Sequence, residues 1–253
     1  MYRPATTRLT EKDEGALRQL NLLNRFGAVL FLAVSLFFVI DTAQHPNQGF
    51  LPLFVSWYQR DVGAQTVLVD SDVYLGYFSF VFTLLACLDH AWVGWNGRTV
   101  YEAGLAQGVN PFRWTEYFFS ASLMQVLIAM LCGVQDVLLL LAVGVLMALC
   151  MVFGWLAEVD PVRARTHFWL GCLPFLASWA IVFSSFGLAA HHAEDMPDFV
   201  YAATLSLVGL HCLFAYNQWR DVSYLKRERA FILLSPTAKL LLAFITWGGI
   251  RSL

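Results

Sequence analysis

Residues 137–157 read VLLLLAVGVLMALCMVFGWLA and contain no charged side chain. A run of about 20 apolar residues is long enough to cross the roughly 30 Å hydrocarbon core of a bilayer as an α-helix. The 253-residue chain as a whole has the same character, with 58% hydrophobic and 13% charged residues. Soluble domains contain about 45–50% and about 25% of these classes. The composition therefore predicts an integral membrane protein.

Six further apolar runs predict an all-α membrane protein, a single seven-transmembrane-helix bundle that takes up residues 1–253. The third helix has a clear start, because Asn110 suits the N-cap and Pro111 suits the first helical position. The expected spans are residues 20–41, 73–95, 111–133, 135–157, 167–190, 198–219 and 230–250.

The loop between the first two spans, residues 42–72, is longer than the others. Residues 54–58 and 66–69 are rich in β-branched and aromatic side chains, and the turn-forming segment Asp61-Val62-Gly63 lies between them. This pattern predicts a short β-hairpin. Its apolar side chains could form a dimer interface or cover the helix bundle, and both interpretations stay open.

The basic residues predict the orientation. Arg60 and Arg251 fall on one side of the seven spans, and 13 basic residues fall on the other. Short cytoplasmic loops carry the excess of Lys and Arg, so we expect a cytoplasmic N-terminus and an extracellular C-terminus in a multi-pass protein of the cell membrane. The 13 residues are Arg3, Arg8, Lys12, Arg18, Arg25, Arg98, Arg113, Arg163, Arg165, Arg220, Lys226, Arg227 and Arg229.

Several classes of function find no support in the sequence. A net charge of −2 gives no indication of a nucleic-acid partner. The 5 cysteines lie inside apolar runs without metal-ligand spacing, so neither a disulfide nor a metal site is expected. The sequence shows neither a nucleophile and a base at a spacing that suits catalysis nor a soluble domain that could hold an active site. An enzyme is therefore not expected.

Lys239 is a basic residue near the centre of the last span. A charge at membrane depth is costly and marks a functional site by default. Glu116 is its natural partner, about 9 Å into the third span, while Lys239 lies about 15 Å into the seventh and its side chain points back toward the carboxylate. A structural ion pair between helices is the alternative interpretation.

A lysine in an apolar pocket can condense with an aldehyde to form a Schiff base. Glu116 would be its counterion, and Ser120 and Met124 follow on the same helix face. Ser235 precedes Lys239 by one turn, although either serine could equally bond its own helix carbonyl. The candidate aromatic wall consists of Tyr117, Trp179, Phe183 and Phe214.

Asp89 and His90 form a further ionisable cluster, in the second span at a depth comparable to Glu116. A buried histidine beside a carboxylate can store a proton near neutral pH. Alternatively, one of the two faces the headgroups, and His90 is then the better candidate for the internal position. His211 in the sixth span is a weaker candidate.

Several of these stretches resemble the heliorhodopsin family. The third-span run NPFRWTEY at 110–117, followed by Ser120-Ala121-Ser122, is similar to the family's third-helix signature. LSPTAK at 234–239 is similar to its retinal-binding segment, and FAYN at 214–217 also matches. The inverted topology and the long first outer loop agree, so the resemblance covers nearly the whole chain.

The resemblance implies retinal, all-trans in the dark, on Lys239, with Glu116 as counterion and Ser120 and Ser235 around the Schiff base. It also implies that His90 belongs to a proton-accepting group and that the protein forms a homodimer. Many members carry a histidine in the first helix, whereas residues 20–41 contain none. Asp89 can compensate for it.

A light sensor agrees better with the sequence than a proton pump. Pumping relatives typically place a second carboxylate where Ser235 stands and a proton donor where Leu127 stands. We therefore expect a photoreceptor that passes the Schiff-base proton to an internal cytoplasmic-side cluster and signals to an unknown cytoplasmic partner. The alternatives are a light-modulated proton channel or transporter, and a seven-span receptor or transporter without a chromophore.

Overall fold

The computed structural model describes residues 11–192 and 196–252, which form eight α-helices and one two-stranded sheet. Seven of the helices are long and apolar enough to cross a membrane, so the expectation of a seven-helix, multi-pass membrane protein is confirmed. The elements are α1 (Glu11–Gln44), β1 (Phe50–Gln59), β2 (Gly63–Tyr74), α2 (Leu75–Gly94), α3 (Arg98–Gln107), α4 (Pro111–Leu131), α5 (Val137–Val159), α6 (Ala164–His192), α7 (Asp198–Trp219) and α8 (Tyr224–Ser252).

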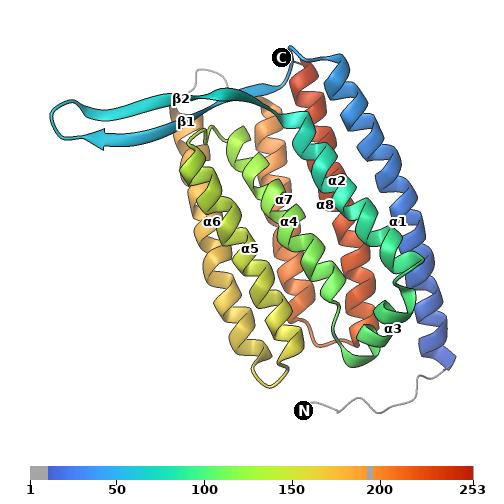
Figure 1. Cartoon of the computed structure of the whole chain (residues 1–253). Coiled ribbons are helices and arrows are strands. Elements are labelled where there is room, and N and C mark those ends of the chain that lie inside the picture. The colour runs from blue at the N-terminus through green and yellow to red at the C-terminus, as the bar shows by residue number, and fades with distance from the viewer. Residues whose placement is uncertain (1–10, 193–195, 253) are drawn as a thin grey trace.

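The bundle has two distinct ends (Figure 1). The hairpin of β1 and β2 lies beside the C-terminus at one end, called here the hairpin end, and α3 lies at the opposite end, called here the α3 end. Helix α2 packs against α1 and α4, α5 packs against α4 and α6, and α8 packs against α7, α1 and α2. Glu116 is near the α3 end of its helix, while Lys239 is near the middle of α8.

The short helix α3 was not predicted, because its ten polar-rich residues read as a loop between two spans. Tyr101 and Leu105, one turn apart, are its buried residues and pack with Leu17, Leu20 and Ile232. The helix ends at Gly108, whose φ of 77° is left-handed and favours glycine. Packing against α1, α2 and α8 therefore stabilises a helix that would be marginal alone.

The predicted hairpin is confirmed and is longer than the sequence indicated. β1 and β2 pair antiparallel from Phe50↔Tyr74 to Gln59↔Gly63. The backbone N–H of Phe54 donates to the carbonyl of Gln135 (2.9 Å), and that of Ser56 donates to Oδ2 of Asp136 (2.8 Å). The hairpin is thus attached to the start of α5.

Asp136 has two roles that substitution can separate. Its Oδ1 accepts the N–H groups of Leu138 and Leu139, which caps α5, while Oδ2 holds Ser56. The hydrogen bonds with Ser56 and with the backbone hold the pKa of Asp136 below its usual range. The attachment is therefore strongest above the ordinary carboxyl pKa and weakens as the pH falls through the lowered value.

We predict that Asp136→Ala speeds amide exchange both at Ser56 and in the first turn of α5, because the loss of a cap costs about 1 kcal/mol. Asp136→Asn is the matched control: its amide oxygen still caps α5, but its NH₂ group cannot accept from Ser56. Hydrogen exchange of the two segments in detergent checks this. Equal protection at Ser56 in Asp136→Asn and wild type would contradict the attachment.

Candidate functional site

Lys239 and Glu116 form a buried ion pair between α8 and α4. Nζ of Lys239 lies 3.3 Å from Oε2 of Glu116 and donates to Oγ of Ser235 at 2.8 Å. The two charged side chains are only 3% and 5% exposed. Nζ also lies 5.0 Å from the ring centroid of Tyr117, within range of a cation–π contact. The structure thus brings together four residues that the sequence singled out.

Helix geometry explains this convergence. Ser235 precedes Lys239 by one turn of α8, and Glu116, Ser120 and Met124 follow one face of α4 and are all buried. Oε1 of Glu116 and Oγ of Ser120 are buried and have no hydrogen-bond partner among the described residues. Buried polar atoms usually have a partner. These two oxygens are therefore free to accept further hydrogen bonds near the ion pair.

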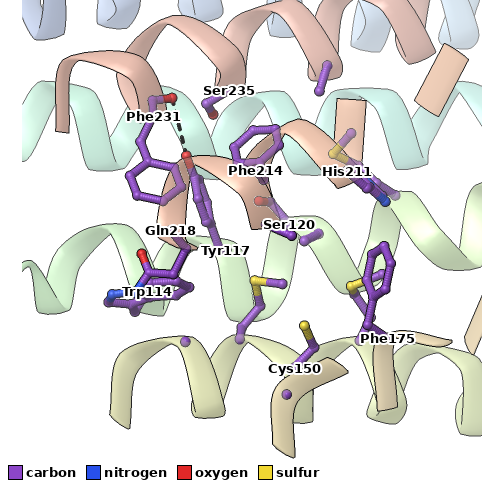
Figure 2. Close-up of a pocket in the computed structure, with 18 of the residues that line it drawn as sticks. Trp114, Tyr117, Ser120, Cys150, Phe175, His211, Phe214, Gln218, Phe231 and Ser235 are labelled. Carbon is purple, nitrogen blue, oxygen red and sulfur yellow. Dashed lines mark hydrogen bonds between the residues drawn. The ribbon is translucent and has the colours of Figure 1, made fainter. Parts of the chain in front are cut away.

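An apolar cavity of about 120 Å³ begins at Lys239 and Ser235 and extends between α4, α5, α6 and α7. It is much larger than the roughly 10–15 Å³ that one water needs. Figure 2 shows aromatic rings from several helices around it and the hydrogen bond from the Tyr117 hydroxyl to the Phe231 carbonyl (3.4 Å). Besides Lys239 and Ser235, the lining includes Trp114, Tyr117, Ser120, Met124, Met147, Met151, Phe168, Phe175, Phe214 and Phe231.

This donor set and shape fit retinal. An amine at one end of an apolar cavity is the arrangement that an apolar aldehyde needs for condensation, and the orphaned Glu116 and Ser120 oxygens lie where a charged nitrogen would need partners. His211, a weak candidate from the sequence, also lines this cavity, and its Nδ1 is buried without a partner among the described residues.

Two expected wall residues lie outside the cavity. Phe183 is 38% exposed on the bundle surface, and Trp179 is buried but packs beyond the cavity, against His211 at 5.5 Å between ring centroids. The cavity contacts α6 from Phe168 to Phe175. Trp179 is one turn farther along and Phe183 two turns, so both fall past its end.

A second, polar cavity of about 20 Å³ lies on the α3 side of the ion pair. It has space for about one water. Asp89, His90, Glu116 and Ser235 all line it, so both members of the predicted proton-accepting cluster are beside the ion pair. His90 is 5% exposed and its Nδ1 bonds Oδ1 of Asn24 on α1 at 2.7 Å, whereas Asp89 is partly exposed.

The structure contains a charged network that the sequence did not predict. Arg113, which reads in the sequence only as a basic residue near the membrane surface, is 4% exposed and pairs with both Glu158 and Glu228. Asn110, Trp114, Tyr101 and Tyr224 complete the network. The only signal in the sequence was that Glu158 and Glu228 stand at the ends of long apolar runs. This signal is weak, because an acidic residue at such a position is usually taken to be solvent-exposed.

Comparison with known proteins gives a family and a fold. The sequence profile of the heliorhodopsin family matches residues 17–250. A search of curated protein sequences finds no match. Among solved structures, cyanorhodopsin from the cyanobacterium Calothrix sp. is similar, with a TM-score of 0.69 and 14% identity over 93% of this chain and 95% of that chain.

Two other solved structures extend the likeness. The transmembrane domain of the rhodopsin phosphodiesterase of Salpingoeca rosetta has a TM-score of 0.65 and 11% identity, over 99% of this chain and 92% of that chain. A light-driven proton pump of Leptosphaeria maculans has a TM-score of 0.55 and 12% identity, over 97% and 98%. At such identities the likeness shows the rhodopsin fold and nothing finer.

The ion pair predicts a specific pattern of stability in the ligand-free protein. Glu116→Gln leaves the Lys239 amine without its buried counter-charge, a change that costs about 3–5 kcal/mol in buried pairs. Lys239→Met combined with Glu116→Gln removes both charges and is expected to recover much of this loss. Thermal unfolding in detergent measures both variants. A single Glu116→Gln variant as stable as wild type would contradict the coupling.

Proposed function

The chain belongs to the heliorhodopsin family, and from this premise we propose that it is a non-pumping, retinal-binding photoreceptor. The family binds retinal. The observation that carries the residue assignment is the buried Lys239–Glu116 pair at the mouth of the apolar cavity. When bound, retinal supplies light absorption and light-driven isomerisation, through an imine bond to Nζ of Lys239.

The surrounding residues hold the proton on that nitrogen. Glu116 stabilises the positive charge at Nζ through its carboxylate, and the Ser235 hydroxyl, 2.8 Å away, orients it. Ser120 provides a further hydroxyl within the same cavity wall. Tyr117, Phe214 and Met124 line the cavity and exclude water, which strengthens each electrostatic interaction inside it.

The distribution of polar groups supports a sensor. Asp89 and His90 lie on the α3 side of Lys239, in the cavity that Glu116 also lines. On the hairpin side, the fully buried Leu127 and Leu242 fill the core. A proton released from Nζ therefore has acceptors on the α3 side, and we propose that the cluster of His90 and Asp89 receives it and that no net transport follows.

We propose that the α3 end faces the cytoplasm, as the 13-to-2 distribution of basic residues indicates. The N-terminus is then cytoplasmic and the C-terminus extracellular. An unidentified signalling partner would bind at the α3 end. A homodimer is supported by the exposed apolar side chains of the hairpin, among them Trp57, Tyr58, Val67 and Leu68. We also propose that the protein has no enzymatic activity.

Reconstitution with all-trans-retinal tests the assignment of the chromophore. The wild type is expected to gain a visible absorption band, and Lys239→Ala is expected to lack it, because Lys239 is the only lysine among the described residues that lines the cavity. Glu116→Gln should keep the band but shift its maximum, because the counter-charge beside Nζ is lost. A visible band in Lys239→Ala would exclude this site, and an unshifted Glu116→Gln spectrum would exclude Glu116 as the counterion.

The polar cavity favours one second candidate, a light-modulated proton conductance through Asp89 and His90. Whole-cell recording at fixed voltage under illumination separates it from the sensor. We expect no photocurrent, because Leu127 and Leu242 occupy the hairpin side of the site. A photocurrent that Asp89→Asn abolishes would establish the conductance instead.

A further inference from the structure

The buried network around Arg113 contains more acidic than basic groups. Glu158 and Glu228 both pair with the single guanidinium of Arg113, and all three side chains are at most 5% exposed. Arg227, on the same helix as Glu228, interacts with Glu158 at longer range but forms no ion pair within 4.0 Å among the described residues. At contact distance two carboxylates therefore face one guanidinium, an excess of negative charge that is costly in the protein interior.

The surrounding donors show how the excess charge is held. Glu158 accepts from the N–H groups of Arg113, Asn110 and Trp114 and from the Tyr224 hydroxyl. Glu228 accepts from Arg113, from the side-chain amide of Asn110 (2.8 Å) and from the Tyr101 hydroxyl (3.0 Å). Such donors offset part of the cost of burying two carboxylates beside one guanidinium, and one added proton would remove the excess negative charge.

The donors also show which carboxylate can take that proton. An N–H group can only donate, whereas a tyrosine hydroxyl can also accept. Oε2 of Glu158 already meets two N–H donors besides Tyr224, and its Oε1 faces Arg113. Oε1 of Glu228 meets one N–H donor, the side-chain amide of Asn110, besides the Tyr101 hydroxyl, which can turn and accept the new O–H. Glu228 is therefore the better site for an added proton.

Glu228 is connected to the surroundings of the ion pair by a shared cavity and by a chain of hydrogen bonds. It lines the polar cavity together with Glu116, Asp89 and His90. A chain of hydrogen bonds also runs from Nδ1 of His90 to Asn24 (2.7 Å), from Asn24 to the Tyr101 hydroxyl (3.4 Å), and from Tyr101 to Glu228 (3.0 Å). The proton-accepting cluster thus continues into the Arg113 network.

We propose that Glu228 is the terminal acceptor of the proton that light releases from Nζ of Lys239, an inference that rests on the proposed function. The N–H bond at Nζ breaks and an O–H bond forms at Oε1 of Glu228, so a positive and a negative charge are neutralised together. Tyr101 then accepts from Glu228 in place of donating to it. Because Tyr101 is a buried anchor of α3, the proton changes the hydrogen bonding of that helix.

Light-minus-dark infrared spectroscopy of the retinal-bound protein tests this. We expect a positive carbonyl-stretch band of a protonated carboxyl, which ¹³C-labelled glutamate displaces and which Glu228→Gln abolishes. The glutamate label separates it from a band of Asp89. A band of unchanged intensity in Glu228→Gln would overturn the proposal. Absence of any light-induced change in the wild type would instead reject the photoreceptor function itself.

The two tyrosines form a matched pair that does not alter the charge of the network. Tyr101→Phe removes the hydroxyl partner of Glu228, so the carbonyl band should move, whereas Tyr224→Phe removes the partner of Glu158 and should leave it in place. A band that moves in Tyr224→Phe but not in Tyr101→Phe would contradict the assignment. These variants keep the test decisive if Glu228→Gln does not fold.

An acid titration of the ligand-free protein gives a readout that is independent of retinal. Asp89, His90, Glu116 and Glu158 also face the cavity or the network and titrate in the same experiment. We expect the wild type to gain one carbonyl band that Glu228→Gln lacks and Tyr224→Phe retains. The same set of bands in wild type and Glu228→Gln would overturn the acceptor role.

Discussion

The ion pair of Lys239 and Glu116 is the interaction on which the rest of the structure depends. A lone amine or carboxylate is costly to bury at this depth, and here each of the two groups lies beside a partner of opposite charge. The pair links α8 to α4, with Nζ 3.3 Å from Oε2. The apolar cavity begins at Lys239, whose amine has both a counter-charge and a hydroxyl partner.

The polar interior of the protein is distributed asymmetrically about that pair. Toward the α3 end lie the His90 cavity and the Arg113 network, which together contain the carboxyl groups of Asp89, Glu116, Glu158 and Glu228 and the guanidinium of Arg113. Toward the hairpin end the fully buried Leu127 and Leu242 lie in the core, and Asp41 is held by Arg251 (2.6 Å) and Trp247 (3.1 Å). This distribution supports the proposal that a proton leaving Nζ is received on the α3 side, where Asp89 and His90 line the cavity beside Glu116.

Much of the fold and the centre of the site could be predicted because isolated charges stand out in apolar runs. Lys239 and Glu116 were identified in this way, and so was His90. The roles of Tyr101, Glu158 and Glu228 could not be predicted from the sequence. Each of these residues lies at or outside the end of a span, where a polar residue is usually taken to be solvent-exposed. Only the packing of α3, α5 and α8 around Arg113 buries them. Which aromatic residues line the cavity could not be read from the sequence, because aromatic residues are frequent here and sequence does not fix the position of a cavity along a helix.

The central claim is that light moves a proton from Lys239 into the α3 half of the protein and that the proton stays there. Transient absorption of the retinal-bound protein in lipid vesicles, with a pH-sensitive dye in the external solution, tests this directly. We expect the visible band to be lost and regained while the dye remains silent. A dye signal that rises and decays together with the loss of the Nζ proton, in amounts close to one proton per protein, would contradict it.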